Sequence, residues 1–172
     1  MTTSLKYPSV LAESGAGNAW QNLQNAASTP GAATATLLLD GAAKQVDITA
    51  ASLAFAIPAG ATINGITATV YSIAGEINTY DLGVTMKKSG TTTETKTQTG
   101  LADSIPVAYG TATDKWSTNW TANDINANIS LHLNFTLGVG AIAFFTFDGV
   151  GVTVYYTVNG VRGRQFRERG AR

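Results

Sequence analysis

Short runs of β-branched, aromatic and small residues, broken by frequent turn signals, constrain the fold of this chain more than any other feature. Turns signalled by Gly, Pro, Asn or Asp separate these runs about every 8–12 residues, a spacing typical of all-β sandwiches and barrels. Together with a hairpin over residues 80–99, the candidate strands are residues 33–39, 44–48, 53–57, 66–73, 131–137, 142–147 and 150–158. We therefore predict an all-β fold: a single antiparallel β-sandwich, jelly-roll-like, with an extended N-terminal arm and an Arg-rich C-terminal tail.

The 172 residues are enough for one domain with a substantial core. Residues 1–30 are rich in Ser, Ala, Asn and Gly, with Tyr7 and Trp20 as isolated aromatics, and we interpret them as an extended arm. Residues 31–160 form the predicted sandwich, and residues 161–172 form the tail. No secretory signal and no apolar run long enough to span a membrane is predicted.

The most detailed local prediction is the hairpin. A two-residue turn at Ser89-Gly90 places Lys88 opposite Thr91. The regular register that follows makes one face apolar or Thr throughout and the other face polar or small, as a half-buried antiparallel pair requires. The predicted solvent-facing pairs are Lys87–Thr92, Thr85–Glu94, Gly83–Lys96 and Asp81–Gln98.

The residues that catalysis usually requires are sparse. The chain has no Cys and a single His, His132, which strand alternation places opposite an apolar face. Thr121-x-x-Asp124 has the spacing of a helix capping box. Because Asp commonly bonds its own backbone in turns, we assign turn and cap roles to the carboxylates, with a loop Ca²⁺ site as the alternative. We predict no catalytic residues, metal ligands or cofactor. The candidate acids are Asp81, Asp103, Asp114, Asp124 and Asp148.

A cluster of large aromatic residues, Tyr109, Trp116 and Trp120, allows two interpretations. Exposed rings would form a platform for stacking sugars. Buried rings would instead attach a loop to the edge of the sandwich, which is the interpretation we favour.

Charge is distributed unevenly along the chain. The tail carries five arginines and one glutamate, a net charge of +4, whereas residues 1–161 carry six lysines against ten acidic residues. Such a tail either docks on a partner or is a solvated terminus. Five charges without a basic patch elsewhere are too few to predict nucleic-acid binding. The candidate docking residues are Arg162, Arg164, Phe166, Arg167, Arg169 and Arg172.

Three segments, in this order, carry a resemblance to a known group of proteins: residues 54–66, with Ile-Pro-Ala-Gly-Ala-Thr-Ile-Asn-Gly-Ile, residues 109–126, with Tyr-Gly and Trp120-Thr-Ala-Asn-Asp, and residues 147–156, ending in Val-Tyr-Tyr. Trp20-Gln-Asn and Ala33-Thr-Ala fit the same pattern. Over residues 18–158 the chain resembles small tailed-bacteriophage virion proteins with a jelly-roll-like β-sandwich. The resemblance implies a structural role without catalysis, and it does not cover the Arg-rich tail.

The predicted function is therefore that of a non-enzymatic virion structural protein, in first place a capsid decoration (cement) subunit. The alternatives are a tail, collar or baseplate component, or a glycan-binding β-sandwich on the virion. The expected partners are further copies of the chain, as a trimer or other small homo-oligomer, and the major capsid protein or another virion protein. The expected location is the virion, without a membrane partner.

Overall fold

The structure is a computed structural model, and it describes residues 1–15, 19–31, 34–39, 44–74, 80–101, 106–137 and 143–158. This part of the chain contains ten strands. The strands are β1 (Thr2–Lys6), β2 (Ala12–Gly15), β3 (Ala35–Leu39), β4 (Lys44–Thr49), β5 (Thr62–Ala74), β6 (Tyr80–Lys88), β7 (Thr91–Leu101), β8 (Val107–Thr111), β9 (Ile129–Leu137) and β10 (Ala143–Thr157). The helical segments are a 3₁₀ turn at Leu23–Ala26, α1 (Ala50–Leu53) and a π-helical turn at Asp124–Asn128.

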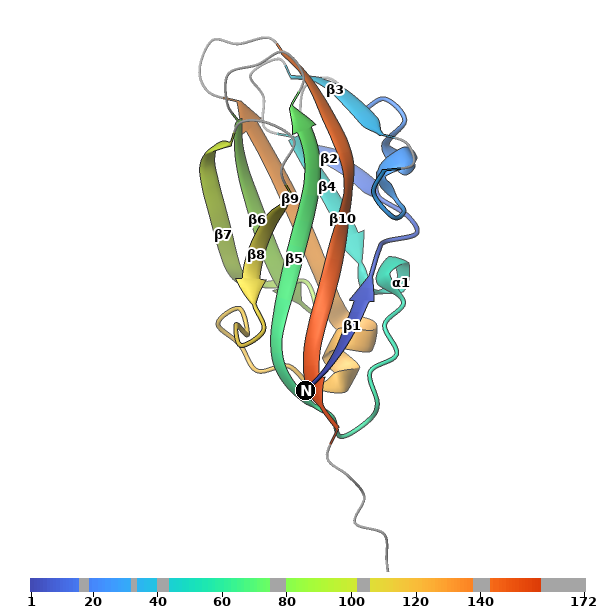
Figure 1. Cartoon of the computed structure of the whole chain (residues 1–172), viewed down its shortest axis with the longest axis vertical. Coiled ribbons are helices and arrows are strands. Elements are labelled where there is room, and N and C mark those ends of the chain that lie inside the picture. The colour runs from blue at the N-terminus through green and yellow to red at the C-terminus, as the bar shows by residue number, and fades with distance from the viewer. Residues whose placement is uncertain are drawn as a thin grey trace, which may run out of the picture.

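The strands form two antiparallel sheets that pack face to face (Figure 1). The first sheet has the order β1-β10-β5-β8, with β3 also paired to β10, and the second has the order β2-β4-β9-β6-β7. Successive strands alternate between the two sheets except at the β6–β7 hairpin, which gives the jelly-roll-like connectivity. The predicted antiparallel β-sandwich is confirmed.

The core lies between the sheets and is built from alternate residues of each strand. Val70, Ala68 and Ile66 of β5 are buried opposite valines of β10. Trp20, Phe135 and Phe147 form a cluster with ring centroids 5.5–5.7 Å apart. Because Phe135 belongs to the second sheet and Phe147 to the first, these three rings join the two layers.

The described part of the first thirty residues contributes two strands and a 3₁₀ turn to the sandwich itself. Strand β1 pairs with β10 in the first sheet, and β2 pairs with β4 in the second. Leu11 and Trp20, which lie on either side of β2, are both buried in the core. The strands of this segment therefore cover one edge of each sheet.

Three predicted strands differ from the structure. Residues 53–57 were expected to be extended, but Leu53 ends α1, whose first turn is capped by the Thr49 hydroxyl. Ala54 follows with φ 47°, a left-handed conformation that ends the helix. The two runs expected at 142–147 and 150–158 belong, where they are described, to the single strand β10, which bends at a bulge beside Gly149 (φ 138°).

The β6–β7 hairpin has the predicted turn at Ser89-Gly90, with Lys88 opposite Thr91 and Lys87 opposite Thr92. Beyond these pairs the predicted register is wrong by one residue, because a β-bulge between Met86 and Lys87 leaves Thr93 as an extra residue. The Thr93 hydroxyl donates to the Met86 carbonyl at 3.1 Å within this bulge.

The bulge exchanges the two faces of β7. Thr95 and Thr97 lie on the solvent side, where Glu94 and Lys96 were expected. Glu94 and Lys96 lie instead beside the loop that follows β8, where Lys96 contacts Glu94 at 2.6 Å and Asp114 at 3.0 Å. The edge of the sandwich can accept these charges because both acids neutralise the lysine there.

Candidate functional site

The aromatic residues Tyr109, Trp116 and Trp120 are buried, with exposed fractions of 2%, 0% and 6%. An exposed stacking platform made of these three rings is therefore absent, and the second interpretation, an attached loop, describes them. Trp116 Nε1 donates to the Ile66 carbonyl and Trp120 Nε1 to the Lys115 carbonyl, each at 2.9 Å. Both rings thus hold the segment after β8 against the end of the sandwich.

Two glycines allow this loop to approach so closely. A Cβ atom at Gly65 would overlap the backbone of Ala112, and one at Gly110 would overlap the Ile66 carbonyl. Gly110 also has φ 82°, which disfavours any other residue. Gly65 and Gly110 belong to the segments that carry the resemblance to virion proteins, so part of that pattern encodes the attachment of the loop.

The predicted local turn and cap roles are found for Asp114 and Asp124, whereas Asp81 and Asp148 accept from backbone N–H groups that are distant in sequence. Thr121 and Asp124 form a reciprocal capping box, with Thr121 N–H donating to Asp124 Oδ2 at 2.8 Å. Asp81 accepts from the Gly100 N–H, Asp114 from the Trp116 N–H, and Asp148 from the Gly31 N–H. Asp103 lies outside the described residues.

Among the described residues, no group of three or more His, Asp or Glu side chains could hold a metal ion. No helix described by the structure has both the length and the apolarity needed to cross a membrane. The six predicted docking residues of the tail, from Arg162 to Arg172, lie outside the described residues.

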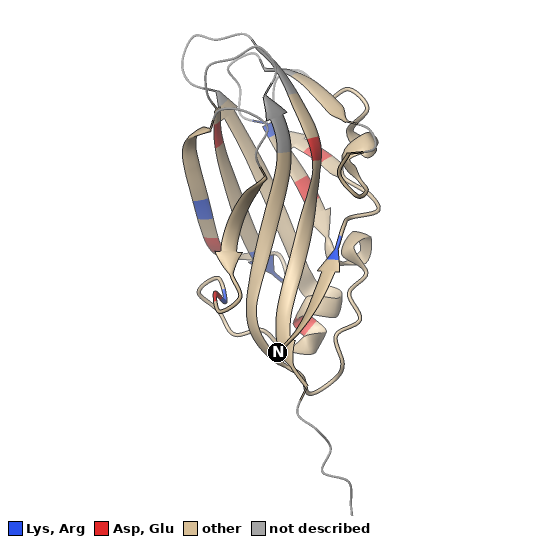
Figure 2. Cartoon of the chain, viewed as in Figure 1, with Lys and Arg blue, Asp and Glu red and all other residues tan. Residues whose placement is uncertain are grey.

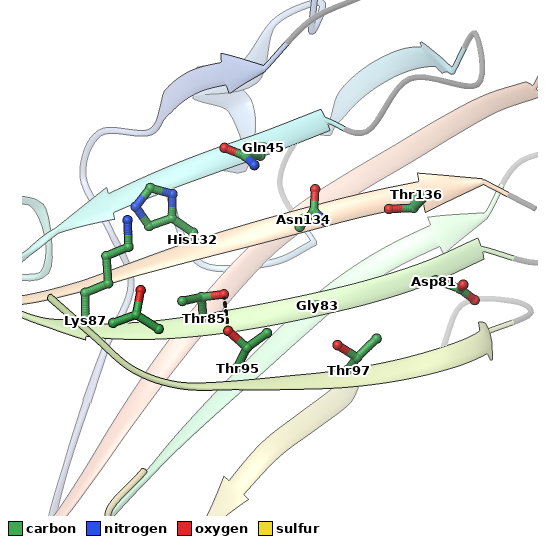
Figure 3. Close-up of a pocket in the computed structure, with 11 residues that line it drawn as sticks. Gln45, Asp81, Gly83, Thr85, Lys87, Thr95, Thr97, His132, Asn134 and Thr136 are labelled. Atoms are coloured by element: carbon green, nitrogen blue, oxygen red, sulfur yellow. Dashed lines mark hydrogen bonds between the residues drawn. The ribbon is translucent and has the colours of Figure 1, made fainter. Parts of the chain in front are cut away.

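A groove of about 450 Å³ crosses the outer face of the second sheet and was not predicted as a site (Figure 3). It spans four neighbouring strands, β4, β9, β6 and β7. Its lining is polar and contains no Phe, Tyr or Trp. The lining residues are Gln45, Asp81, Gly83, Thr85, Lys87, Thr92, Thr95, Thr97, His132, Asn134 and Thr136.

Strand pairing arranges these residues in rows that run across the sheet. Each row contains solvent-facing residues of two to four neighbouring strands, with apolar residues between the rows pointing into the core. The rows, from one end of the groove, are Ser130–Lys87–Thr92, then Asp47–His132–Thr85–Thr95, then Gln45–Asn134–Gly83–Thr97, then Thr136–Asp81.

Gly83 forms the floor of the groove. A Cβ atom at this position would lie 3.5 Å from Thr97 Oγ1 and 3.8 Å from the Asn134 Cβ, which are ordinary contacts. Neither backbone conformation nor crowding therefore requires a glycine here, in contrast to Gly65 and Gly110. What the glycine provides is open space between the Thr85 and Asp81 side chains of the same strand.

His132 is fixed within the groove by its neighbours on β4 and β2. Its Nδ1 contacts Asp47 Oδ1, and Asp47 Oδ2 accepts a hydrogen bond of 2.6 Å from the Ser14 hydroxyl. Burial, followed by the charge of Lys87, lowers the pKa of His132 below its usual value although Asp47 acts in the opposite direction. The lowered pKa favours the uncharged imidazole at neutral pH, in which one ring nitrogen is a donor and the other an acceptor.

The sequence pattern contained part of this groove. The four residues of β6 were predicted to face solvent, and His132 was predicted to lie opposite the apolar face of its strand, as it does. Strand alternation could not reveal that β9 separates β6 from β4, nor that the Thr93 bulge brings Thr95 and Thr97 to the groove. Both depend on pairing between segments that are distant in sequence.

No known family model matches the sequence, and no curated protein matches it. Among solved structures, the chain is similar to TmCBM61 in complex with β-1,4-galactotriose, with 12% identity over 86% of this chain and 90% of that one and a TM-score of 0.49. The CBM36-1 domain of a multidomain xylanase from the hindgut metagenome of Trinervitermes trinervoides shows 11% identity over 93% and 100%, with a TM-score of 0.37.

A structure of infectious bursal disease virus, Gt strain, is also similar, with 15% identity over 90% of this chain and 32% of that one and a TM-score of 0.33. At such identities and scores, these similarities concern the two-sheet architecture alone.

Proposed function

We propose that this chain is a non-enzymatic binding subunit whose groove takes a hydroxyl-rich ligand, specifically a short saccharide chain. The observation that carries the proposal is the polar lining of the groove, which crosses four strands and contains five threonines. Each threonine hydroxyl can donate and accept a hydrogen bond, as a sugar hydroxyl can. The amides of Gln45 and Asn134 add both functions at the next strands.

The groove is also already shaped for a ligand. The Thr85 and Thr95 hydroxyls bond each other at 2.8 Å, and Asp47 orients His132. Because these side chains stand on paired strands rather than on loops, binding would cost little ordering of the protein. The lining contains no Phe, Tyr or Trp on which a sugar commonly stacks, so hydrogen bonds would hold the sugar.

The setting that we propose is a tailed-bacteriophage virion, and the support for it is the sequence resemblance over residues 18–158. A capsid decoration subunit and a tail, collar or baseplate component are both compatible with a rigid sandwich. In either case the groove would face outward from the particle as a glycan-binding surface.

Filling the groove tests its role. Gly83→Gln places an amide side chain over the floor, in a position that accepts a Cβ without a clash. We expect saccharides bound by the native chain on a glycan array to be lost from this variant, with an unchanged melting temperature. Thr67→Gln, on the outer face of the first sheet, is the matched control and should retain binding. Equal binding by the native chain and by Gly83→Gln would contradict the proposal, and so would a native chain that binds no saccharide.

A further inference from the structure

Lys87, at one end of the groove, is the described lysine whose position most clearly suggests a ligand. Lys44, Lys88 and Lys96 each have a carboxylate oxygen within 3.4 Å. Lys87 forms no ion pair with any described carboxylate, although its side chain is half-buried in the groove. A half-buried ammonium of this kind gains more from an anionic partner than an exposed one does.

The acids nearest to Lys87 along the groove do not neutralise it. Asp47 keeps its charge beside the uncharged His132, but its carboxylate contacts His132 and the Ser14 hydroxyl and forms no ion pair with Lys87. Asp81 lies six residues further along β6, about 20 Å away in an extended strand. This separation exceeds the Debye length of about 8 Å at physiological ionic strength. The groove lining therefore carries one lysine, Lys87, at one end and one carboxylate, Asp81, at the other. Figure 2 shows that most of the described ribbon carries no charged residue.

His132 supports the same assignment. Figure 3 shows the Lys87 side chain extending beside the His132 ring. The lowered pKa of His132 favours the uncharged ring, which offers one ring nitrogen as a hydrogen-bond acceptor and adds no second positive charge. A ligand at this end thus meets one cation, one acceptor and the hydroxyls of Thr85 and Thr92.

We propose that the groove binds a saccharide bearing an anionic substituent, a carboxylate or a sulfate ester, and that Lys87 holds this substituent. The inference rests on the proposed function of the groove. The uncharged remainder of the ligand runs over Gly83 toward Asp81, whose carboxylate accepts hydroxyl protons and repels a second acid. The charge difference between the two ends therefore sets the direction in which the chain binds.

The test compares neutral, uronate-containing and sulfated oligosaccharides on one array, with affinities of the bound ones measured by titration calorimetry. We expect the native chain to prefer one of the acidic sets. Since a hydrogen bond to a charged group is worth about 1.5–3 kcal/mol, Lys87→Met should weaken that binding about ten- to hundredfold. Lys87→Arg should retain the preference, and Lys115→Met, which removes an exposed charge elsewhere, should leave it unchanged.

The outcomes separate the two proposals. Neutral saccharides bound as tightly as acidic ones, with no effect of Lys87→Met, would overturn the assignment of Lys87 and leave the groove as a neutral-glycan site. Binding of no saccharide of any set would overturn both proposals. Preference for uronate over sulfate, or the reverse, identifies the anionic group.

Discussion

At the scale of single residues, His132 should make the stability of the protein depend on mildly acidic pH. Its pKa is lowered in the folded state, first by burial and then by Lys87, against the opposing effect of Asp47. Between the folded pKa and the unfolded value of about 6.5, the unfolded chain binds more protons. Stability from this group is therefore complete above about pH 6.5 and is lost as the pH falls through the folded pKa. Melting temperatures measured from pH 8 to pH 5 should show this decline.

The matched variant is His132→Gln, which keeps a donor near Asp47 but does not titrate. Its melting temperature should be flat over the same range. An equal decline in both proteins would assign the pH dependence to another group.

The contribution of Asp124 to stability can be distinguished from that of His132, because it changes at a lower pH. Burial would raise the pKa of Asp124, but the Lys88 ion pair and the Thr121 hydrogen bonds together lower it. The stability that Asp124 contributes is thus lost only as the pH falls below about 3.9.

At the scale of elements, the attachment of the loop after β8 should be the part of the fold most sensitive to small substitutions. Gly110→Ala would place a methyl group against the Ile66 carbonyl and 2.8 Å from Trp116 Nε1, in a left-handed backbone conformation. We expect the free energy of unfolding, measured by urea denaturation, to fall by at least about 1–3 kcal/mol. The tryptophan fluorescence of the native state should change as well, since Trp116 must move.

Gly83→Ala is the control for that prediction. Its added methyl group makes ordinary contacts, and its backbone does not have a positive φ. The free energy of unfolding should therefore change by less than about 1 kcal/mol. If Gly83→Ala and Gly110→Ala lower the free energy of unfolding by similar amounts, the close approach of the loop is not the reason for a glycine at position 110.

The strands show how far the sequence could predict these elements and where it could not. Alternation predicted β9 correctly, because the buried residues Leu131, Leu133 and Phe135 fit only the two-residue periodicity of a strand. Residues 53–57 read as extended because Phe55 and Ile57 are apolar at alternate positions, and both are indeed buried. The capping by Thr49 and the left-handed Ala54 decide the conformation there, and neither is visible in apolar periodicity. Prediction of the groove would have required the order of strands in the sheet, which is determined by pairing between segments distant in sequence.

At the scale of the whole molecule, the prediction concerns assembly. The first residues of β1 pair with the last residues of β10, Thr2 with Tyr156, so the two ends of the described chain lie at the same end of the sandwich (Figure 1). If the chain is a decoration subunit, light scattering after size-exclusion chromatography should detect a small homo-oligomer. The oligomer should comigrate with empty capsids of the parent phage when the two are mixed.

Deleting residues 162–172 is the variant that tests the proposed docking tail in this assay. The truncated chain should keep the melting temperature of the native chain and attach less to particles. Wild-type occupancy by the truncated chain would exclude the tail as the docking segment. A monomer that ignores capsids would favour a tail, collar or baseplate position over capsid decoration.

The extra residue in β7 has a consequence for how such a surface can evolve. One face of this strand carries Thr95 and Thr97, and the other carries Glu94 and Lys96. The bulge at Thr93 selects the threonines for the outer face, whereas a strand of the same length in regular register would present the charges there. A lineage could therefore exchange a hydroxyl-rich surface for a charged one through gain or loss of this bulge, without substituting any of these four residues.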